Sequence, residues 1–274
     1  MTPSIPKATP PAAAAGSVSI GADLTVHRLG FGAMRLTGAG VWGPPADRQA
    51  AVQVLRRALE LGVNFIDTAD SYGPGVSEEI IAEALHPYPA GLVIATKGGL
   101  TRPRASQWER DAHPAHLRAA CEGSLRRLKL ERIDLYQLHA IDPRVPLADS
   151  LGELARLQAE GKIRYIGVSN QSLMELQRSQ QLVRVVSVQN RYNLADRDAE
   201  DVLQYCEQQG LAFIPWFPLG AGRDASKAKS AIAWLLARSP VVLPIPGTAS
   251  VAHLEQNVAA ASLRLTAAEL RALG

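Results

Sequence analysis

Short apolar runs alternate with stretches of helical periodicity along most of this chain, and this alternation limits the folds open to it. From Leu29 onward the sequence predicts eight strands, at residues 29–34, 63–66, 92–96, 133–138, 165–168, 183–188, 212–216 and 241–245. Each is followed by a stretch in which apolar residues recur at helical spacing. Strands separated by helices pair in parallel, and eight such units favour closure. The predicted fold class is α/β, a (β/α)8 TIM barrel.

An open, doubly wound sheet is the alternative for the same pattern. That fold binds a nucleotide phosphate at a glycine-rich turn between its first strand and first helix. The first strand here carries Gly30 and Gly32, but no third glycine follows and no helix begins there. The barrel is therefore the favoured architecture.

The start of the chain differs in character from the rest. Residues 1–16 are rich in proline and alanine, which predicts a disordered tail. Residues 18–20 and 24–26 then flank a Gly-Ala-Asp turn and predict a short N-terminal β-hairpin. A chain of 274 residues can bury one large core, so residues 17–274 are predicted to form a single barrel domain.

Composition narrows the classes of function. Aromatic residues make up 5% and the net charge is +3, with basic residues scattered rather than clustered, so we expect no nucleic-acid partner. No apolar run approaches the length of a membrane span, and the N-terminus lacks the layout of a secretion signal, so we expect no membrane contact. Cys121 and Cys206 lie in separate helical patterns without metal-ligand spacing. This predicts reduced thiols, no metal and a cytoplasmic protein.

Ionisable side chains stand at the ends of three consecutive predicted strands. Asp67 follows the second strand, Lys97 the third and His139 the fourth, while Tyr72 lies on the loop after Asp67. In a barrel the carboxyl ends of the strands share one rim, where catalytic groups are placed. These four residues can therefore converge although they are remote in sequence. Taken alone, Asp67 or Asp70 could equally cap the next helix, with Tyr72 packed against it.

Eight short motifs give the chain a resemblance to the aldo-keto reductase superfamily. They occur in the family's order over nearly the whole length from Leu29, at residues 29–32, 65–73, 94–97, 134–139, 167–170, 188–190, 218–220 and 245–248. Any one of them is a weak signal, whereas eight in the right order are a strong one. The resemblance implies hydride transfer between a nicotinamide cofactor and a small-molecule carbonyl substrate.

The resemblance also implies a catalytic tetrad of Asp67, Tyr72, Lys97 and His139. Tyr72 would be the general acid that protonates the developing alkoxide, although a free tyrosine has a pKa of about 10. The cation of Lys97 beside it would lower that pKa, and Asp67 would pair with Lys97. His139 would donate a hydrogen bond to the carbonyl oxygen and orient it.

An NADPH site along the same rim is the third implication of the resemblance, with NADH left open. Polar Ser169, Asn170 and Gln189 would bind the nicotinamide carboxamide, unless Ser169 and Asn170 only cap a helix. Trp216 would stack on the nicotinamide ring, where the family usually has tyrosine. The implied cofactor-binding residues are Gly32, Met34, Ser169, Asn170, Gln189, Trp216, Phe217, Leu219, Gly220, Gly247, Thr248, Ser250, His253, Gln256 and Asn257.

Two features depart from the family's pattern near the expected cofactor site. Gly247 and His253 stand where many members carry lysine and arginine. Without those two cations a preference for NADPH is not assured, so NADH is left open. A protonated His253 can still contribute a positive charge. The segment at residues 220–230 is also shorter than usual for the family. A catalytically weak, nucleotide-binding regulatory subunit on the same fold is therefore the alternative function.

The substrate pocket is expected from two tryptophans. Trp42 and Trp108, together with Trp216, would form an aromatic pocket suited to a flat aldehyde, unless Trp108 merely covers the barrel mouth. Within the superfamily, residues 43–45, 217–220 and 246–254 resemble bacterial pyridoxal reductases (pyridoxine 4-dehydrogenases). The resemblance implies a monomer or weak homo-oligomer.

Overall fold

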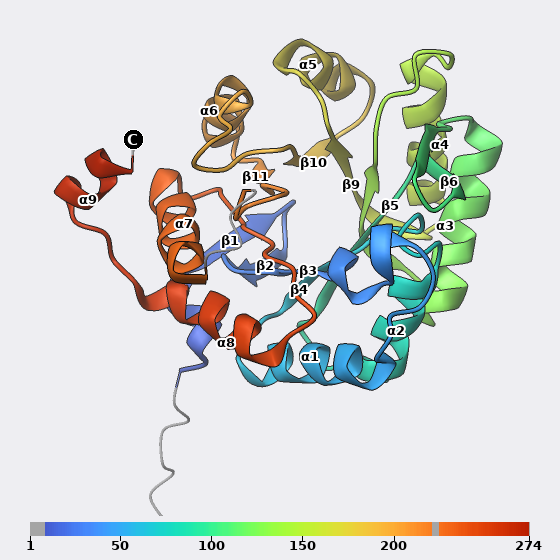
Figure 1. The fold of residues 1–274 in the computed structure, drawn as a ribbon. Helices are drawn as coiled ribbons and strands as arrows, with labels where there is room; N and C mark the ends of the chain where they lie inside the picture. The colour runs from blue at the N-terminus through green and yellow to red at the C-terminus, as the bar shows by residue number, and fades with distance from the viewer. Residues whose placement is uncertain (1–8, 221–224, 274) are drawn as a thin grey trace, which may run out of the picture.

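The computed structural model describes residues 9–220 and 225–273, and its parallel strands curl into a barrel (Figure 1). Seven strands pair side by side in the order β11-β10-β9-β8-β5-β4-β3, and every neighbouring pair is parallel. This confirms the predicted α/β barrel. The strands are β3 (Phe31–Gly32), β4 (Phe65–Asp67), β5 (Val93–Gly98), β8 (Ile133–Leu138), β9 (Ile163–Ser169), β10 (Val185–Gln189) and β11 (Ala212–Phe213).

The eighth predicted strand, residues 241–245, closes the barrel through a few hydrogen bonds rather than a regular ladder. On one side the amide of Leu243 donates to the carbonyl of Phe213 at 2.8 Å, and Val242 forms a single bridge with Phe213. On the other side the amide of Gly30 donates to the carbonyl of Pro244 at 2.9 Å. Proline has no N–H, so the segment cannot continue as a paired central strand. The prediction of a full strand is wrong here for that reason.

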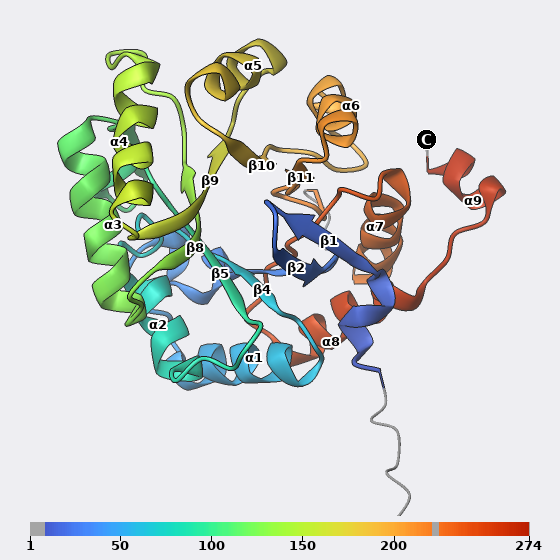
Figure 2. The same ribbon diagram turned by 180° about the vertical axis from the view of Figure 1, so that it is seen from behind.

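In the part of the chain that the structure describes, helices α1 to α8 surround the sheet (Figures 1 and 2). The ninth, α9 (Ala267–Ala272), follows a short 3-10 turn and lies outside the ring. The helices of the ring are α1 (Arg48–Glu60), α2 (Val76–Leu85), α3 (Pro114–Leu128), α4 (Leu147–Ala159), α5 (Leu173–Leu182), α6 (Glu200–Gln209), α7 (Ala225–Arg238) and α8 (Val251–Ala259).

Local sequence signals set several helix ends. Asp47 caps α1 by accepting a hydrogen bond from the amide of Ala50. Ser172 and Glu175 form a reciprocal capping box at the start of α5. The left-handed conformation of Gly210 ends α6. Because these signals are local, the sequence locates such ends well.

A hairpin of β1 (Ser17–Ile20) and β2 (Leu24–His27) closes the amino-terminal end of the barrel (Figure 2). Its apolar side chains pack in one buried cluster with residues that point into the barrel, among them Phe65, Leu135 and Ile214. The predicted hairpin is confirmed, and it acts as the floor of the barrel. The carboxyl end of the barrel is the end left open for a site.

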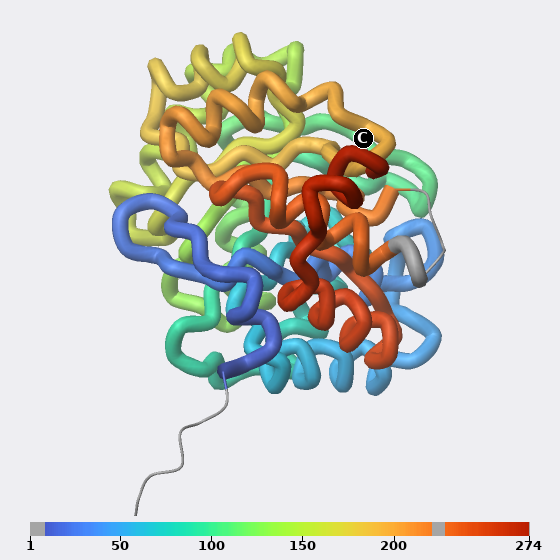
Figure 3. Tube along the Cα trace, turned by 90° about the vertical axis from the view of Figure 1, so that its left-hand side faces the viewer, coloured from blue at the N-terminus to red at the C-terminus, as the bar shows by residue number. Residues whose placement is uncertain are grey.

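Residues 11–15 are ordered, where the sequence predicts a disordered tail. Pro11–Ala15 form a short 3-10 helix, and Ala12 is fully buried against the barrel. The amide of Ala12 donates to the carbonyl of Leu61 at 2.9 Å, and Arg264 donates to the carbonyl of Ala14 at 2.7 Å. Small alanines fit a crowded surface that the sequence pattern does not reveal. Residues 1–8 lie outside the described part of the chain. Figure 3 shows that residues 11–15 lie beside the C-terminal part of the chain.

Two further sequence expectations can be compared with the fold. Among the described residues, no helix is both long enough and apolar enough to cross a membrane. Cys121 and Cys206 are buried free thiols, and burial raises the pKa of each to about 12. Both thiols are therefore chemically quiet, as the expectation of reduced structural cysteines requires.

Candidate active site

The four residues of the expected tetrad lie together at the open end of the barrel. Nζ of Lys97 donates to Oδ2 of Asp67 and to the carbonyl of Thr68, both at 2.7 Å, and lies 3.4 Å from the hydroxyl oxygen of Tyr72. The ring of Tyr72 meets the ring of His139 edge-on, with centroids 5.9 Å apart. All four side chains are buried or nearly so. The sequence-based expectation that strand ends bring them together agrees with this geometry.

Strand register explains the convergence. Strands β4, β5 and β8 are neighbours, with Asp67 paired to Ala95 and Lys97 paired to Gln137. Side chains two positions apart on a strand point to the same side. Asp67, Lys97 and Gln137 therefore all point into the barrel, and His139 follows Gln137 by the same alternation. The polar residues form a layer above the apolar interior.

The buried ion pair of Lys97 and Asp67 controls the electrostatics of this layer. Burial by itself lowers the pKa of Lys97, but Asp67 and Tyr72 together raise it above its usual value. Lys97 is therefore charged at neutral pH. Burial raises the pKa of Tyr72, and the charge of Lys97 offsets that rise only in part. Lys97 thus lowers the pKa of Tyr72 as expected, but burial raises it by more, so the net change is upward. The phenol therefore stays protonated at neutral pH.

Gln137 is a residue of the site that sequence reasoning missed. Its Nε2 donates to Oδ1 of Asp67 at 3.2 Å, and Nε2 of Gln189 donates to the same oxygen at 2.8 Å. With Lys97 on Oδ2, the Asp67 carboxylate is held by three donors. The signal in the sequence is its spacing, since Gln137 stands two residues before His139 and so shares its side of the strand.

His139 is a neutral imidazole in this environment. Burial, and then the neighbouring charge of Lys97, hold the pKa of His139 well below its usual value. Oγ of Ser71 lies 3.5 Å from Nδ1, and no described residue forms a hydrogen bond with Nε2. A neutral imidazole in this position can donate a hydrogen bond to a ligand oxygen without adding a charge.

We expect the depressed pKa of His139 to make the fold less stable in mild acid. The imidazole takes up a proton at about pH 6.5 in the unfolded chain but not in the folded one. The contribution of His139 to stability is therefore present above that pH and is lost as the pH falls, by about 1.4 kcal/mol per pH unit. Urea unfolding at several pH values between neutrality and pH 5 measures this slope. The slope should be shallower in His139→Gln, and parallel curves for the two proteins would contradict the assignment.

Polar side chains from β9 and β10 form the opposite side of the site. Oγ of Ser169 donates to the carbonyl of Gln189 at 2.7 Å, and Nδ2 of Asn170 donates to the carbonyl of His139 at 3.0 Å. Both residues are thus fixed by neighbouring strand ends, and neither caps α5, whose cap is Ser172. Because Nε2 of Gln189 is directed to Asp67, its Oε1 is left as an acceptor that no described residue uses.

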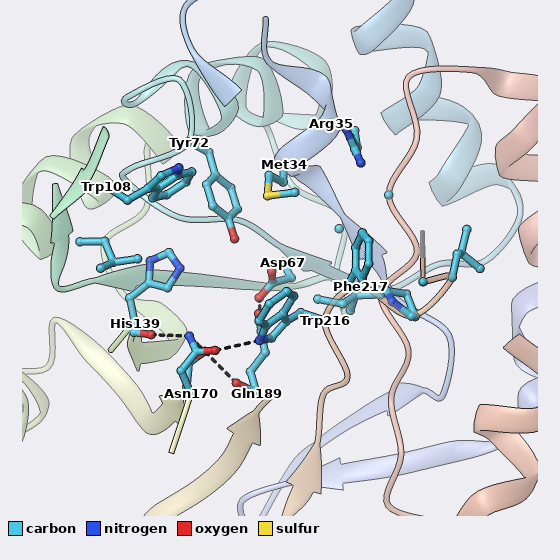
Figure 4. Close-up of a pocket in the computed structure, with 18 residues that line it drawn as sticks. Met34, Arg35, Asp67, Tyr72, Trp108, His139, Asn170, Gln189, Trp216 and Phe217 are labelled. Atoms are coloured by element: carbon cyan, nitrogen blue, oxygen red, sulfur yellow. Dashed lines mark hydrogen bonds between the residues drawn. The ribbon is translucent and has the colours of Figure 1, made fainter. Parts of the chain in front are cut away.

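Trp216 provides a flat aromatic surface beside these amides. Its Nε1 donates to Oδ1 of Asn170 at 2.9 Å, which fixes the indole plane (Figure 4). The guanidinium of Arg191 lies 5.8 Å from the centre of the indole and 5.3 Å from the ring of Phe217. A planar ring that carries a carboxamide fits this side of the site, with its ring on Trp216 and its amide nitrogen toward Oε1 of Gln189.

A cavity of about 380 Å³ joins the two sides. A volume of this size suits a small-molecule site. Tyr72, Asp67, His139 and Trp108 line it on one side. Most of the expected cofactor residues also line it, namely Gly32, Met34, Ser169, Asn170, Gln189, Trp216, Phe217, Leu219, Gly220 and Gly247. Four lining residues were not expected from the sequence, namely Arg35, Leu100, Pro218 and Ile245.

Gly247 could not carry a side chain without a local shift. A Cβ built on it would lie 2.4 Å from the carbonyl oxygen of Gly32, where the two sides of the barrel closure meet. A lysine at this position, as the family resemblance implies for many members, would therefore require the backbone to shift. Arg35 lies next to Gly247, with its Cγ 3.6 Å from the same Cβ position, and contributes a cation to the lining of the cavity (Figure 4).

The other expected cofactor residues lie apart from the cavity, around the start of α8. Thr248 accepts a hydrogen bond from the amide of Ser250 at 3.0 Å, and Ser250 caps the helix through the amide of His253. His253 and Gln256 are exposed, whereas Asn257 is buried. The sequence expectation groups these five with the cavity residues. The structure places Thr248 and Ser250 just before α8, and His253, Gln256 and Asn257 on it.

The two expected pocket tryptophans occupy different places. Trp108 lies on β7 (Gln107–Arg110), in a hairpin with β6 (Leu100–Arg104), and lines the cavity. Its ring meets that of Tyr72 edge-on at 6.4 Å. Trp42 is not among the lining residues and packs instead near the guanidinium of Arg102, 5.6 Å from it. Trp108 is therefore the tryptophan that borders the catalytic groups.

Neither Asp67 nor Asp70 caps α2, which was the alternative to a catalytic role for this stretch. The cap position of α2 is Gly75, and no side chain forms a capping hydrogen bond there. Oδ1 of Asp70 is buried without a partner among the described residues. Burial, with the nearby charge of Glu78, raises the pKa of Asp70 to about 8.

The arrangement of this site can be compared with known proteins. A profile of the Aldo/keto reductase family matches residues 28–230 and 222–273, which together span nearly the entire barrel. The chain belongs to the aldo/keto reductase family. As an aldo/keto reductase it is an oxidoreductase. Tyr72, Asp67 and His139 line its cavity and Lys97 is fully buried next to Asp67, and these four are the groups that the family resemblance implies.

Curated relatives of this aldo/keto reductase are similar over most of their length. An uncharacterized oxidoreductase of Schizosaccharomyces pombe is 49% identical over 270 residues, covering 93% of this chain and 88% of the relative. Pyridoxine 4-dehydrogenase of Escherichia coli is 42% identical over 262 residues, covering 88% of this chain and 92% of the relative.

Solved structures agree with the fold. A glycerol dehydrogenase from Gluconobacter oxydans superposes with a TM-score of 0.82 at 28% identity, covering 94% of each chain. An aldo-keto reductase from Klebsiella pneumoniae, solved in complex with NADPH, superposes with a TM-score of 0.80 at 31% identity and covers 94% of this chain and 93% of that one.

Proposed function

We propose that this aldo/keto reductase reduces an aldehyde or a ketone to the alcohol, with NADPH as the hydride donor and Tyr72 as the proton donor. The observation that carries the proposal is the hydroxyl of Tyr72, which faces the cavity with Nζ of Lys97 3.4 Å away (Figure 4). Lys97 is held in turn by Asp67, so a fixed cation stands beside the hydroxyl at neutral pH. A group that must give up a proton to an alkoxide needs such a neighbour.

Each residue of the tetrad has a distinct task in this reaction. The substrate carbonyl oxygen lies between the Tyr72 hydroxyl and the His139 imidazole, whose rings are 5.9 Å apart. Bound NADPH supplies the hydride to the carbonyl carbon. Tyr72 transfers its proton to the oxygen, and Lys97 stabilises the phenolate that remains. Tyr72 then regains a proton from solvent, so that aldehyde, NADPH and one proton give alcohol and NADP⁺.

The cofactor assignment rests on the side of the cavity formed by β9 and β10. Trp216 would hold the nicotinamide ring by stacking, and Gln189, Asn170 and Ser169 would bind its carboxamide. The relative from Klebsiella pneumoniae that was solved with NADPH supports this choice. Thr248, Ser250, His253, Gln256 and Asn257, at the start of α8, would hold the adenosine end, where helix amides favour a phosphate anion. NADH is the other candidate, because Gly247 has no side chain to offer a phosphate.

The substrate that the cavity suits is a flat aromatic aldehyde. Trp108 and Leu100 give the cavity an apolar wall close to Tyr72. The Escherichia coli relative named pyridoxine 4-dehydrogenase makes pyridoxal the specific candidate, with pyridoxine as its product. The buried free thiols suit a reducing compartment. We therefore place the enzyme in the cytoplasm, as a monomer or weak homo-oligomer without nucleic-acid or membrane partners.

The proposal is tested by separating cofactor binding from turnover. Titration with NADPH and with NADH should quench tryptophan fluorescence, because Trp216 lies where the nicotinamide stacks. NADPH consumption is then followed by absorbance with pyridoxal and with 4-nitrobenzaldehyde. Turnover of either aldehyde supports carbonyl reduction, and preference for pyridoxal supports the specific substrate. Quenching without turnover of any aldehyde favours a nucleotide-binding regulatory subunit instead, and absence of quenching contradicts both functions.

A further inference from the structure

A buried arginine that forms no ion pair with any acidic residue in the described part of the chain lies beside the site. Arg102 is on β6, and only 6% of its surface is exposed. Burial lowers the pKa of its guanidinium, and no carboxylate contributes to that shift. Burying a cation without a counter-ion is costly unless all its donors are used. The contacts of Arg102 show how they are used.

The guanidinium donates to four backbone carbonyls that belong to two separate loops. Nη1 and Nη2 donate to the carbonyls of Val41 and Gly40, each at 2.9 Å, on the loop after β3. Nε donates to the carbonyl of Gln107 at 3.1 Å, and Nη2 also donates to that of Ala105, in the β6–β7 hairpin. The planar fork of arginine makes this set of contacts possible. Arg102 thus ties the two loops together.

One of these loops is joined directly to the loop of the proton donor. Val41 has a φ of 59°, which is a rare, strained conformation for a β-branched residue. Its carbonyl accepts from Arg102 and also from the amide of Gly73 at 3.3 Å. Gly73 follows Tyr72 in the chain. Arg102 therefore holds a strained turn against the backbone that carries Tyr72.

Arg102 also lies between two indole rings. The centre of its guanidinium is 5.6 Å from the ring of Trp42 and 3.8 Å from that of Trp108. Trp108 remains 42% exposed although it is large and apolar, and it lies beside Tyr72 at the edge of the cavity (Figure 4). An exposed indole fixed by a cation on one ring face is a ready contact surface for a ligand ring.

We propose that Arg102 is a positioning residue that determines substrate specificity, because it holds Trp108 as a fixed wall against which an aromatic carbonyl substrate packs. The inference rests on the proposed reduction of an aromatic aldehyde and adds to it the residue that fixes the aromatic wall. An aliphatic aldehyde has no ring to place against the indole, so it gains less from this wall. Lysine cannot replace Arg102, since an ammonium group lacks the planar fork that reaches both loops.

The test compares 4-nitrobenzaldehyde with propanal as substrates, using the full chain and NADPH. Arg102→Lys is expected to lower the aromatic-to-aliphatic ratio of kcat/KM about 10-fold, the size of one lost pocket contact, mainly through KM for the aromatic aldehyde. Trp108→Leu should lower the ratio similarly. The double variant should lose no more than the larger single effect, because both changes remove the same wall. Arg104→Lys, an exposed arginine on the same strand, is the matched control and should keep the ratio within about two-fold.

The possible outcomes separate this inference from the proposed function. An unchanged ratio in Arg102→Lys, whether both rates fall equally or neither falls, overturns the inference and leaves carbonyl reduction standing. Additive losses in the double variant also overturn it. If Arg102→Lys does not fold, Trp108→Leu decides alone, and an unchanged ratio there counts against the wall. Failure of the unmodified protein to turn over either aldehyde contradicts the proposed function instead.

Discussion

Replacing Tyr72 with phenylalanine is expected to lower the rate of carbonyl reduction by about 100- to 10,000-fold, the usual contribution of a positioned general acid. The change removes one hydroxyl and keeps the ring, which packs edge-on against Trp108 and His139. Cofactor binding should therefore persist. Steady-state rates with an aromatic aldehyde and quenching of tryptophan fluorescence by NADPH measure the two properties separately.

A second tyrosine provides the control for the Tyr72 variant. The hydroxyl of Tyr205 donates to Gln180 at 2.8 Å on the outside of the barrel, far from the cavity. Tyr205→Phe also removes one hydrogen-bonded hydroxyl and should leave the rate near that of the unmodified protein. If Tyr72→Phe keeps a rate within a few-fold of the control, another group donates the proton. Loss of NADPH quenching in Tyr72→Phe would show that the change disturbs the site as a whole.

Replacing Lys97 with methionine is expected to lower the free energy of unfolding by about 3–5 kcal/mol, because it leaves the carboxylate of Asp67 buried without its cation. The side chains of Lys97 and Asp67 are 0% and 3% exposed, so solvent cannot screen the charge that remains. The pair Lys97→Met with Asp67→Asn removes both charges and should recover part of the loss. Urea unfolding at neutral pH gives the free energy of unfolding of the unmodified protein, of Lys97→Met and of the double variant.

An exposed ion pair gives the reference for the Lys97 measurement. Arg57 forms ion pairs with Glu60 and Glu255 at the surface, where both partners remain well exposed. Arg57→Met should lower the free energy of unfolding far less than Lys97→Met, because water and salt screen exposed ion pairs. A loss of similar size for Lys97→Met would mean that the buried pair is not a structural element. A double variant no more stable than Lys97→Met would place the loss in packing rather than in the unpaired charge.

Sequence reasoning located the parts of the site that depend on strand periodicity. Asp67, Lys97 and His139 each follow an apolar run, and in a parallel barrel those ends must share a rim. Side-chain alternation within each strand, together with motif order, was enough to bring them together with Tyr72. The floor hairpin was predictable as well, because its turn is a local signal.

The remaining features depend on contacts that no local pattern contains. The segment at residues 241–245 reads as an apolar strand, yet Pro244 lacks the amide donor that a ladder needs. Arg102 resembles any basic residue of a polar hairpin, and only the folded chain shows that its donors meet carbonyls of the loop after β3. Trp42 was expected to line the pocket because it is aromatic. Its position beside Arg102 depends on a contact between residues distant in sequence. The Tyr72 pKa depends on burial, which cannot be weighed against the charge of Lys97 before the fold is known.

The hairpin of β1 and β2 has a consequence for the traffic of ligands through the barrel. Because its apolar side chains seal the amino-terminal end, there is no passage along the barrel axis among the described residues. Everything that reaches the catalytic layer enters by the open rim and must leave by the same way. A molecule bound nearer the rim therefore blocks the exit of one bound deeper. The shape of the barrel thus requires the ligand that binds last to be released first.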